Sequence, residues 1–153
     1  MKISLKMLLS TIVVMALALG LSGFYFVNYV FETSLKREVG QASDESSILS
    51  FAFETAVLNV PARYNVLPDS TVDEIASKLE RGGRSTERLI RIADEQKEIL
   101  HISDGFEADK RLLQQIQPDT KSYRIIKTTN GYYVHTCAAI NALGRILYLE
   151  TMK

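Results

Sequence analysis

The sequence predicts an α+β protein in which an N-terminal transmembrane helix continues into a long helix, packed on a five-stranded antiparallel sheet. Three observations lead to this prediction. Residues 7–31 carry no charged side chain, and residues 32–60 contain no proline. Strand-like segments alternate with turn signals over residues 88–152. Helices followed by a β-rich segment are typical of the α+β class, in which helices cover an antiparallel sheet.

The uncharged run is long enough to cross a membrane, because about 20 helical residues at 1.5 Å each span the hydrocarbon core. Lys2 and Lys6 precede it, which by the positive-inside rule places the N-terminus in the cytoplasm. Residues 1–31 are therefore predicted to be a cytoplasmic N-terminus and a transmembrane helix in the lipid bilayer, and residues 32–153 an extracytoplasmic domain. The far end of the run is rich in aromatic residues, which favour the membrane–water boundary: Phe24, Tyr25, Phe26, Tyr29 and Phe31.

A cleavable signal peptide is the alternative interpretation of this run. Its apolar core would be residues 7–19, followed by the small residues Gly20, Ser22 and Gly23 as cleavage positions. The apolar run continues from Phe24 to Phe31, which favours the anchor because a mature chain would expose those rings to water. Both interpretations export the domain, so only its tethering differs.

Charge and cysteine content exclude several functions. The chain has 18 basic and 18 acidic residues, and Lys2 and Lys6 lie in the N-terminal segment, so residues 32–153 carry a net charge of −2. Such a domain lacks the basic surface that nucleic acid requires. Cys137 is the only cysteine, which excludes an intramolecular disulfide and a cysteine-based zinc cluster. The chain contains no P-loop, GxGxxG, HExxH or GxSxG motif, and we expect neither enzymatic activity nor a cofactor.

The long helix shows two superimposed patterns. A seam with alternating spacings of four and three predicts a homodimer through the long helix, with Leu49 and Phe53 in the contact. Further apolar residues (Ile48, Phe51, Ala52 and Val57) widen this face, as in a helix packed on its own sheet. We expect packing on the sheet, with the upper end dimeric. The seam residues are Leu35, Val39, Ala42, Ser46, Leu49, Phe53, Ala56 and Val60.

The remaining elements follow from capping and turn signals. Pro61 ends the long helix, and a second helix begins at Ser70 or Thr71, with Glu74 completing a capping box. It ends at Gly82–Gly83. The Asn130-Gly131 pair predicts a two-residue hairpin turn. The later segments are strands over 88–93 and 98–103, a helix over 107–117, and strands over 123–128, 132–140 and 145–152.

The hairpin turn places a set of polar residues on one face of the sheet. With Asn130-Gly131 as the turn, Thr128 pairs with Tyr133, Ile126 with His135 and Arg124 with Cys137. Alternation then gives one face with Arg124, Ile126, Tyr133, His135 and Cys137. The other face, with Tyr123, Ile125, Val134, Thr136 and Ala138, is small and apolar and is expected to pack against the long helix.

The polar face gives the candidate ligand-binding residues Arg124, Tyr133, His135 and Cys137. A guanidinium, a phenol, an imidazole and a thiol together suit a small polar or anionic ligand. The alternative is the solvent-facing side of a half-buried sheet. A metal site on His135 and Cys137 would need a further ligand. On the first hairpin, Arg91 and His101 are further candidates whose register the sequence leaves open.

The N-terminal run MKISLKMLLSTIVVMALALGLSGFYFVNYVF and the closing segment YYVHTCAAINALGRILYLETMK are similar to those of Gram-positive sensor histidine kinases. With the order of helices and strands between them, the chain resembles the extracytoplasmic PAS-like (Cache-type) sensor region of such membrane-bound kinases. The resemblance implies a PAS-like sheet and a signal-sensing module of a two-component system. Binding of a ligand or an extracellular protein would be transmitted through the membrane helix.

The kinase core of that family is not in this chain. A phospho-accepting histidine followed by an acidic residue and a nearby proline is missing, as are the ATP-binding boxes, and both histidines lie in predicted strands. We therefore expect the sensing part of a longer receptor, or a truncated product, because the kinases that the chain resembles continue into a second membrane helix and a kinase core. The alternative function is a stand-alone, single-pass membrane-anchored binding or adaptor protein.

Overall fold

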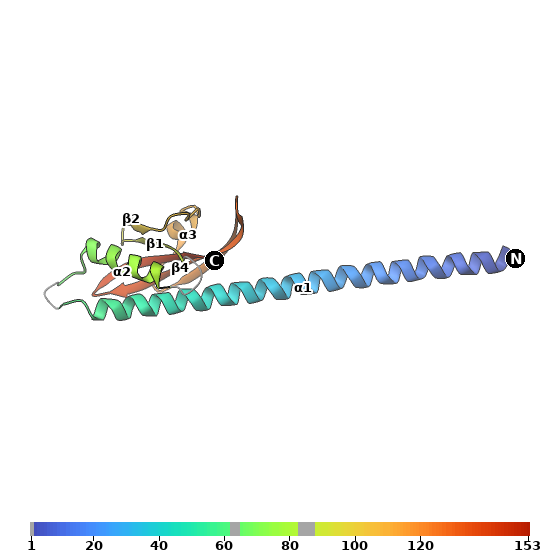
Figure 1. The fold of residues 1–153 in the computed structure, drawn as a ribbon, viewed down its shortest axis with the longest axis horizontal. Coiled ribbons are helices and arrows are strands. Elements are labelled where there is room, and N and C mark those ends of the chain that lie inside the picture. The colour runs from blue at the N-terminus through green and yellow to red at the C-terminus, as the bar shows by residue number, and fades with distance from the viewer. Residues whose placement is uncertain (1, 62–64, 83–87) are drawn as a thin grey trace. The chain divides into compact units, whose positions relative to one another are not determined.

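The computed structural model describes residues 2–61, 65–82 and 88–153. They form two compact units, one up to Glu38 and one over Val39–Lys153. Three helices and five strands are present in the described residues (Figure 1). Their bounds are α1 Lys2–Leu58, α2 Asp69–Arg81, β1 Leu89–Ala93, β2 Ile99–Ile102, α3 Arg111–Gln115, β3 Lys121–Thr128, β4 Gly131–Ala142 and β5 Arg145–Met152.

Helix α1 is the one helix in the described part of the chain that is long and apolar enough to cross a membrane. The apolar window within it buries none of its residues against the rest of the chain. Large side chains such as Leu8, Met15 and Phe24 are more than half exposed. Burial of such surface in lipid is favourable because it removes apolar area from water.

The strands form a single antiparallel sheet in the order β2-β1-β5-β4-β3. β3, β4 and β5 make a meander, and β5 joins this meander to the β1–β2 hairpin. The prediction of an α+β protein with a five-stranded antiparallel sheet is confirmed.

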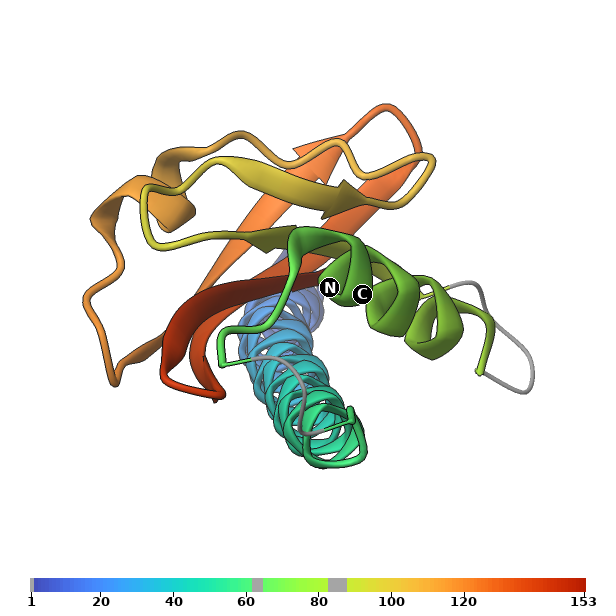
Figure 2. The ribbon, with the colours of Figure 1, turned by 90° about the vertical axis from the view of Figure 1, so that its left-hand side faces the viewer.

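Both faces of the sheet are covered. α2 and the part of α1 within the second unit lie on one face, and α3 lies on the other (Figure 2). The main core contains Phe53 of α1, Val72 of α2 and Leu149 of β5. On the opposite face, Leu113 of α3 packs near Tyr148 of β5.

The seam of α1 faces its own domain. Leu49 and Phe53 are 1% and 0% exposed within a single chain, in the core shared with α2 and the sheet. The prediction that these two residues form the contact between protomers is wrong. A coiled-coil seam and the inner stripe of a helix packed on a sheet share nearly the same spacing, so the pattern alone does not separate them.

The β3–β4 turn lies one residue earlier than predicted. Thr129 and Asn130 form the turn, and Thr128 pairs with Gly131, Ile126 with Tyr133 and Arg124 with His135. The predicted partners are therefore displaced by two residues. A type I′ turn needs positive φ at both central positions. Of the two residues of the predicted turn, Asn130 and Gly131, only Gly131 has a positive φ, of +138°. A displacement of two preserves the alternation, so the predicted division of side chains between the two faces remains.

Both shorter helices differ from the prediction. α2 begins at Asp69 after Pro68, with no side-chain capping bond, so the predicted caps Ser70 and Thr71 lie within its first turn. α3 spans only Arg111–Gln115, and the carbonyl oxygens of Ala108 and Asp109 before it accept hydrogen bonds from a strand side chain. That side chain belongs to the cluster described next.

Candidate functional site

The four predicted ligand-binding residues share one face but lie in different environments. His135 and Cys137 are fully buried, whereas the Arg124 side chain is 44% exposed, with Nη1 3.8 Å from Oδ2 of Asp109. Tyr133 is partly buried against a small apolar cluster formed by residues 106, 108 and 152. None of the four lines either of the two cavities described for this domain. The prediction that they bind a ligand together stays a prediction.

An ion pair between Arg91 of β1 and Glu150 of β5 is the centre of this face. The two residues are register partners, and they are 3% and 0% exposed. Arg91 donates from Nε to Oε2 of Glu150 at 2.6 Å and from Nη2 to Oε1 at 2.7 Å. Such two-point pairing uses the planar fork of arginine and fixes both side chains.

The same guanidinium also holds the segment before α3. Nη1 of Arg91 donates to the Ala108 carbonyl at 2.8 Å, and Nη2 donates to the Asp109 carbonyl at 2.9 Å. The Phe106 ring lies beside the charge, with the guanidinium carbon 4.7 Å from the ring centroid. Arg91 therefore fastens the connection between β2 and α3 to the sheet.

His135 of β4 extends the cluster. Its Nε2 lies 2.8 Å from Oε1 of Glu150, and its ring meets Phe106 edge to face at 5.9 Å. An ionised carboxylate only accepts hydrogen bonds, so Nε2 carries the proton and donates it. Nδ1 of His135 is buried and has no hydrogen-bond partner within the described residues. The carboxylate of Glu150 thus ties β1, β5 and β4 together.

This arrangement is a filled anion-binding site, in which the carboxylate belongs to the protein. A buried charge is tolerated only when it is paired and hydrogen-bonded, and Arg91 and Glu150 meet both conditions. Within the described residues, the Glu150 carboxylate occupies the donors that Arg91 and His135 Nε2 point toward it. The sequence also allowed this face to be the solvent-facing side of a half-buried sheet. That description fits Arg124, which is exposed, and does not fit His135 or Cys137, which are buried.

Cys137 is a buried apolar neighbour of this cluster. Its side chain packs with α3 residues Leu112 and Leu113 and with Tyr148. Burial raises the pKa of the Cys137 thiol, and the negative charge of Glu150 raises it further. Among the described residues, no group of three histidine, cysteine or carboxylate side chains could hold a metal ion.

His101, the other histidine, belongs to a separate contact between α2 and β2. Its Nδ1 lies 2.7 Å from Oδ1 of Asp73, and its Nε2 lies 3.0 Å from Oε2 of Glu80. Imidazole donates from both nitrogens only when it is protonated. Of the two further candidates on the first hairpin, Arg91 joins the buried cluster and His101 does not.

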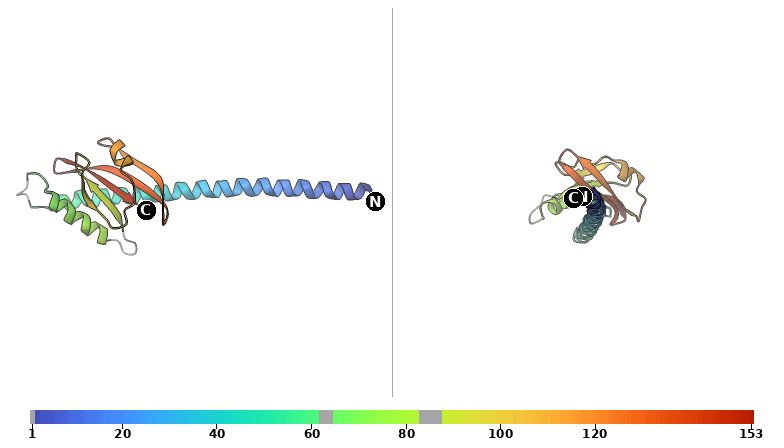
Figure 3. Two further views of the ribbon diagram at one scale, coloured as in Figure 1. Left: turned by 90° about the horizontal axis from the view of Figure 1, so that it is seen from above. Right: turned by 90° about the vertical axis from the view of Figure 1, so that its right-hand side faces the viewer.

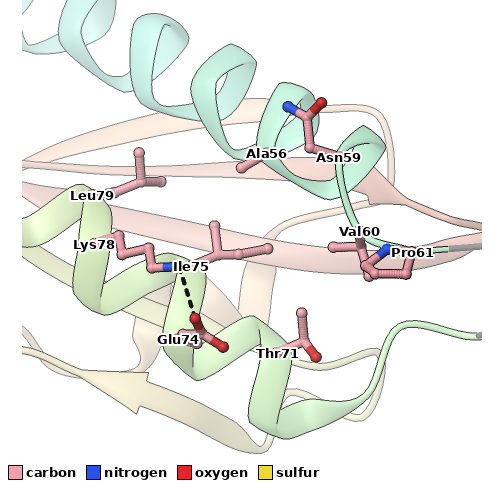
Figure 4. A pocket seen from close by; sticks show the side chains of 9 residues that line it. All are labelled: Ala56, Asn59, Val60, Pro61, Thr71, Glu74, Ile75, Lys78 and Leu79. Atoms are coloured by element: carbon pink, nitrogen blue, oxygen red, sulfur yellow. Dashed lines mark hydrogen bonds and ion pairs between the residues drawn. The ribbon is translucent and has the colours of Figure 1, made fainter.

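A cavity of about 530 Å³ lies between the end of α1 and α2. Ala56, Ile75 and Leu79 supply apolar side chains to its wall (Figure 4). An ion pair between Lys78 and Glu74, with 2.7 Å between Nζ and Oε1, lies among the lining residues. Its size lies within the range of small-molecule sites. The complete lining is Ala56, Asn59, Val60, Pro61, Thr71, Glu74, Ile75, Lys78 and Leu79.

Sequence reasoning missed Glu150, Phe106 and this cavity. A signal existed for Glu150, because it is the only acidic residue in the apolar strand RILYLETM, as Arg91 is the only charge in LIRIA. A basic residue in one apolar strand and an acidic residue in another predict a cross-strand pair once the strands are known to be neighbours. Phe106 and the cavity carry no local signal, since they depend on tertiary packing.

Comparison with models of known protein families, with curated proteins and with solved structures finds no match for this chain.

Proposed function

We propose that the chain is the extracytoplasmic, PAS-like signal-sensing module of a two-component sensor histidine kinase, anchored by its N-terminal helix. One observation carries this proposal. α1 is continuous from the apolar segment to Leu58, and its C-terminal part supplies Leu49, Phe53 and Val57 to the core of the domain. The strand order β2-β1-β5-β4-β3, with helices on the sheet, is compatible with the PAS-like fold that the resemblance implies.

The cavity between α1 and α2 is the sensing site in this proposal. Ala56 near the end of α1 and Val60 just beyond that helix line it, together with Ile75 of α2. A compact, mainly apolar molecule with one polar group fits this lining, because the apolar wall is accompanied by the charges of Glu74 and Lys78. Its binding would change how α1 packs on α2, and the helix itself carries that change along the chain.

The test uses a chimaera in which residues 1–153 precede a second membrane helix and the kinase half of a receptor with a measurable reporter. Ala56→Phe fills the cavity, and Thr55→Phe adds the same ring on the exposed side of α1. We expect Ala56→Phe to change the reporter output at least threefold, while Thr55→Phe leaves it within a factor of 1.5. Thermal melts of both variants report whether the domain remains folded.

The sensing proposal would be contradicted if Ala56→Phe, Thr55→Phe and a chimaera without residues 39–153 all gave the same reporter output as the unsubstituted chimaera. Co-purification of the chain with a separate kinase, combined with that result, would instead support the membrane-anchored adaptor. Both outcomes are read in the same membranes, so expression levels are compared directly.

A further inference from the structure

The β3–β4 hairpin carries an exposed strip of Tyr123, Ile125, Lys127 and Tyr132. The three large apolar side chains are 57%, 39% and 74% exposed. They lie on the same face of the sheet, because Lys127 is the register partner of Tyr132 and residues 123, 125 and 127 alternate along β3. The expectation that Tyr123 and Ile125 pack against the long helix is wrong, although Val134, Thr136 and Ala138 of that face are buried.

The hairpin tip lies at the end of the domain where α1 enters it. Val134 exchanges two backbone hydrogen bonds with Lys153, whose Nζ lies 2.7 Å from Oε2 of Glu45 on α1. The other end of β4, at Ala142, belongs to the core that contains Val57. β4 therefore runs along α1 in the direction from Glu45 to Val57. Its first residues, which precede Val134, extend past Glu45 toward the N-terminal end of this part of α1. Figures 1 and 3 show the orange hairpin at this end of the sheet.

The chain length keeps this end of the domain close to the bilayer, if the membrane anchor of the proposed function is correct. Seven residues, 32–38, separate the aromatic end of the apolar run from Val39. They advance about 10 Å as a helix, and at most about 25 Å when fully extended. The strip is thus tethered within reach of the lipid headgroups.

The side chains of the strip suit that location. Tyrosine places its ring at the acyl boundary and its hydroxyl among the headgroups. Lysine is attracted by the phosphates of anionic lipids. Nζ of Lys127 already lies 5.7 Å from the Tyr132 ring centroid, so the cation and the ring are presented together. We propose that this strip docks the domain on the headgroup layer of an anionic bilayer.

A second copy of the chain is the other candidate occupant, because β3 is an edge strand. Pairing of two edge strands uses backbone groups in the plane of the sheet. The strip side chains project from the face and would remain exposed in such a pair. Lipid covers them, and strand pairing does not.

The test places a fluorescent nitrobenzoxadiazole label on the full chain in vesicles of phosphatidylcholine and phosphatidylglycerol that contain spin-labelled lipid. Asn130→Cys positions the label at the hairpin tip, and Gln96→Cys positions it in the β1–β2 turn at the opposite end of the sheet. We expect spin-labelled lipid to quench the label at position 130 at least threefold more than at position 96. Tyr123→Ser combined with Tyr132→Ser should reduce that difference at least twofold, whereas the exposed-site control Val66→Ser should not.

Lipid charge separates the two contributions, since Lys127→Gln should weaken quenching in vesicles with phosphatidylglycerol and not in pure phosphatidylcholine. Equal, low quenching at both positions in chain that floats with the vesicles would overturn the docking and leave the anchor intact. Chain that does not float with vesicles would overturn the anchor itself. Cross-linking between Asn130→Cys copies without lipid quenching would assign the strip to a second copy and also overturn the docking.

Discussion

Arg91 and Glu150 lie opposite each other on β1 and β5 and form a two-point ion pair that is almost completely shielded from solvent. The pair is extended by His135 from β4 and by the carbonyl oxygens of Ala108 and Asp109. It therefore connects three strands and the segment before α3 at one point. Neither buried charge can lose its partner without a large loss of stability on that side of the domain.

Removal of one partner should be far more costly than removal of an exposed pair. Arg91→Ala or Glu150→Ala leaves an unpaired buried charge, and we expect a loss of about 3–5 kcal/mol in the free energy of unfolding. Arg111→Ala, which breaks an exposed pair with Asp109, should cost less than about 1 kcal/mol. Denaturant unfolding of the full chain in detergent measures both. Similar losses for the buried and exposed pairs would show that the buried pair is not formed.

The double substitution Arg91→Met with Glu150→Leu tests the same pair by a different route. Apolar residues of similar volume often replace a buried ion pair with little loss of stability. We expect the double variant to be more stable than either single variant. Protection of the segment before α3 against hydrogen exchange should nevertheless fall, because Ala108 and Asp109 lose their donor.

The inner face of α1 should be much more sensitive than its outer face. Phe53→Ala removes a fully buried ring and should cost about 3–5 kcal/mol. Phe51→Ala removes a 72% exposed ring only two residues away, and should change stability by less than about 0.5 kcal/mol. Thermal melts of the two variants compare them directly. A larger effect for Phe51 would place the outer face of α1 in an interface.

Acid should weaken the attachment of the β1–β2 turn to β5. A hydrogen bond from Arg145 lowers the pKa of Glu95 below its ordinary value. A lowered folded-state pKa contributes stability above the unfolded value, and this contribution is lost as pH falls through the folded value. The effect should stay below about 1 kcal/mol because the pair is partly exposed. Glu95→Gln should remove this part of the pH dependence below about pH 4.5, and Glu98→Gln should retain it.

A labelling test of the predicted membrane topology requires an engineered thiol. Cys137 is buried and its pKa is raised, so it should react with maleimide only after denaturation. Gln96→Cys adds an exposed thiol, which a membrane-impermeant maleimide should label in intact cells if residues 32–153 are extracytoplasmic. Lys6→Cys should be labelled only after lysis. The reverse pattern would contradict the orientation.

Local periodicity was sufficient for most of the fold. The long α1, the five strands and the division of residues 121–142 between two faces follow from spacing and from one turn signal. The observed hairpin register differs from the predicted one because the turn falls on Thr129 and Asn130, one residue before Asn130 and Gly131. Of the predicted turn residues, only Gly131 adopts a positive φ. α3 is shorter than predicted, and on its N-terminal side the carbonyl oxygens of Ala108 and Asp109 bond to Arg91, a residue distant in sequence that local periodicity does not show.

The site was less predictable for the same physical reason. Arg124, Tyr133, His135 and Cys137 were placed on one face, but their burial depends on α3 and Phe106 crossing that face. Alternation shows which side chains share a side and does not show what covers it. The cavity between α1 and α2 depends on the packing of two helices and has no sequence motif.

β5 lies between β1 and β4, so it receives hydrogen bonds from both hairpins of the sheet. A chain synthesised from its N-terminus onward therefore presents two unconnected hairpins until residues 145–152 have followed. Isolated hairpins are marginally stable in water, and the uncovered core faces would be open to proteases and to aggregation. Assembly of the domain is thus delayed until β5 has been synthesised, and Glu150 arrives last to join Arg91 of one hairpin with His135 of the other.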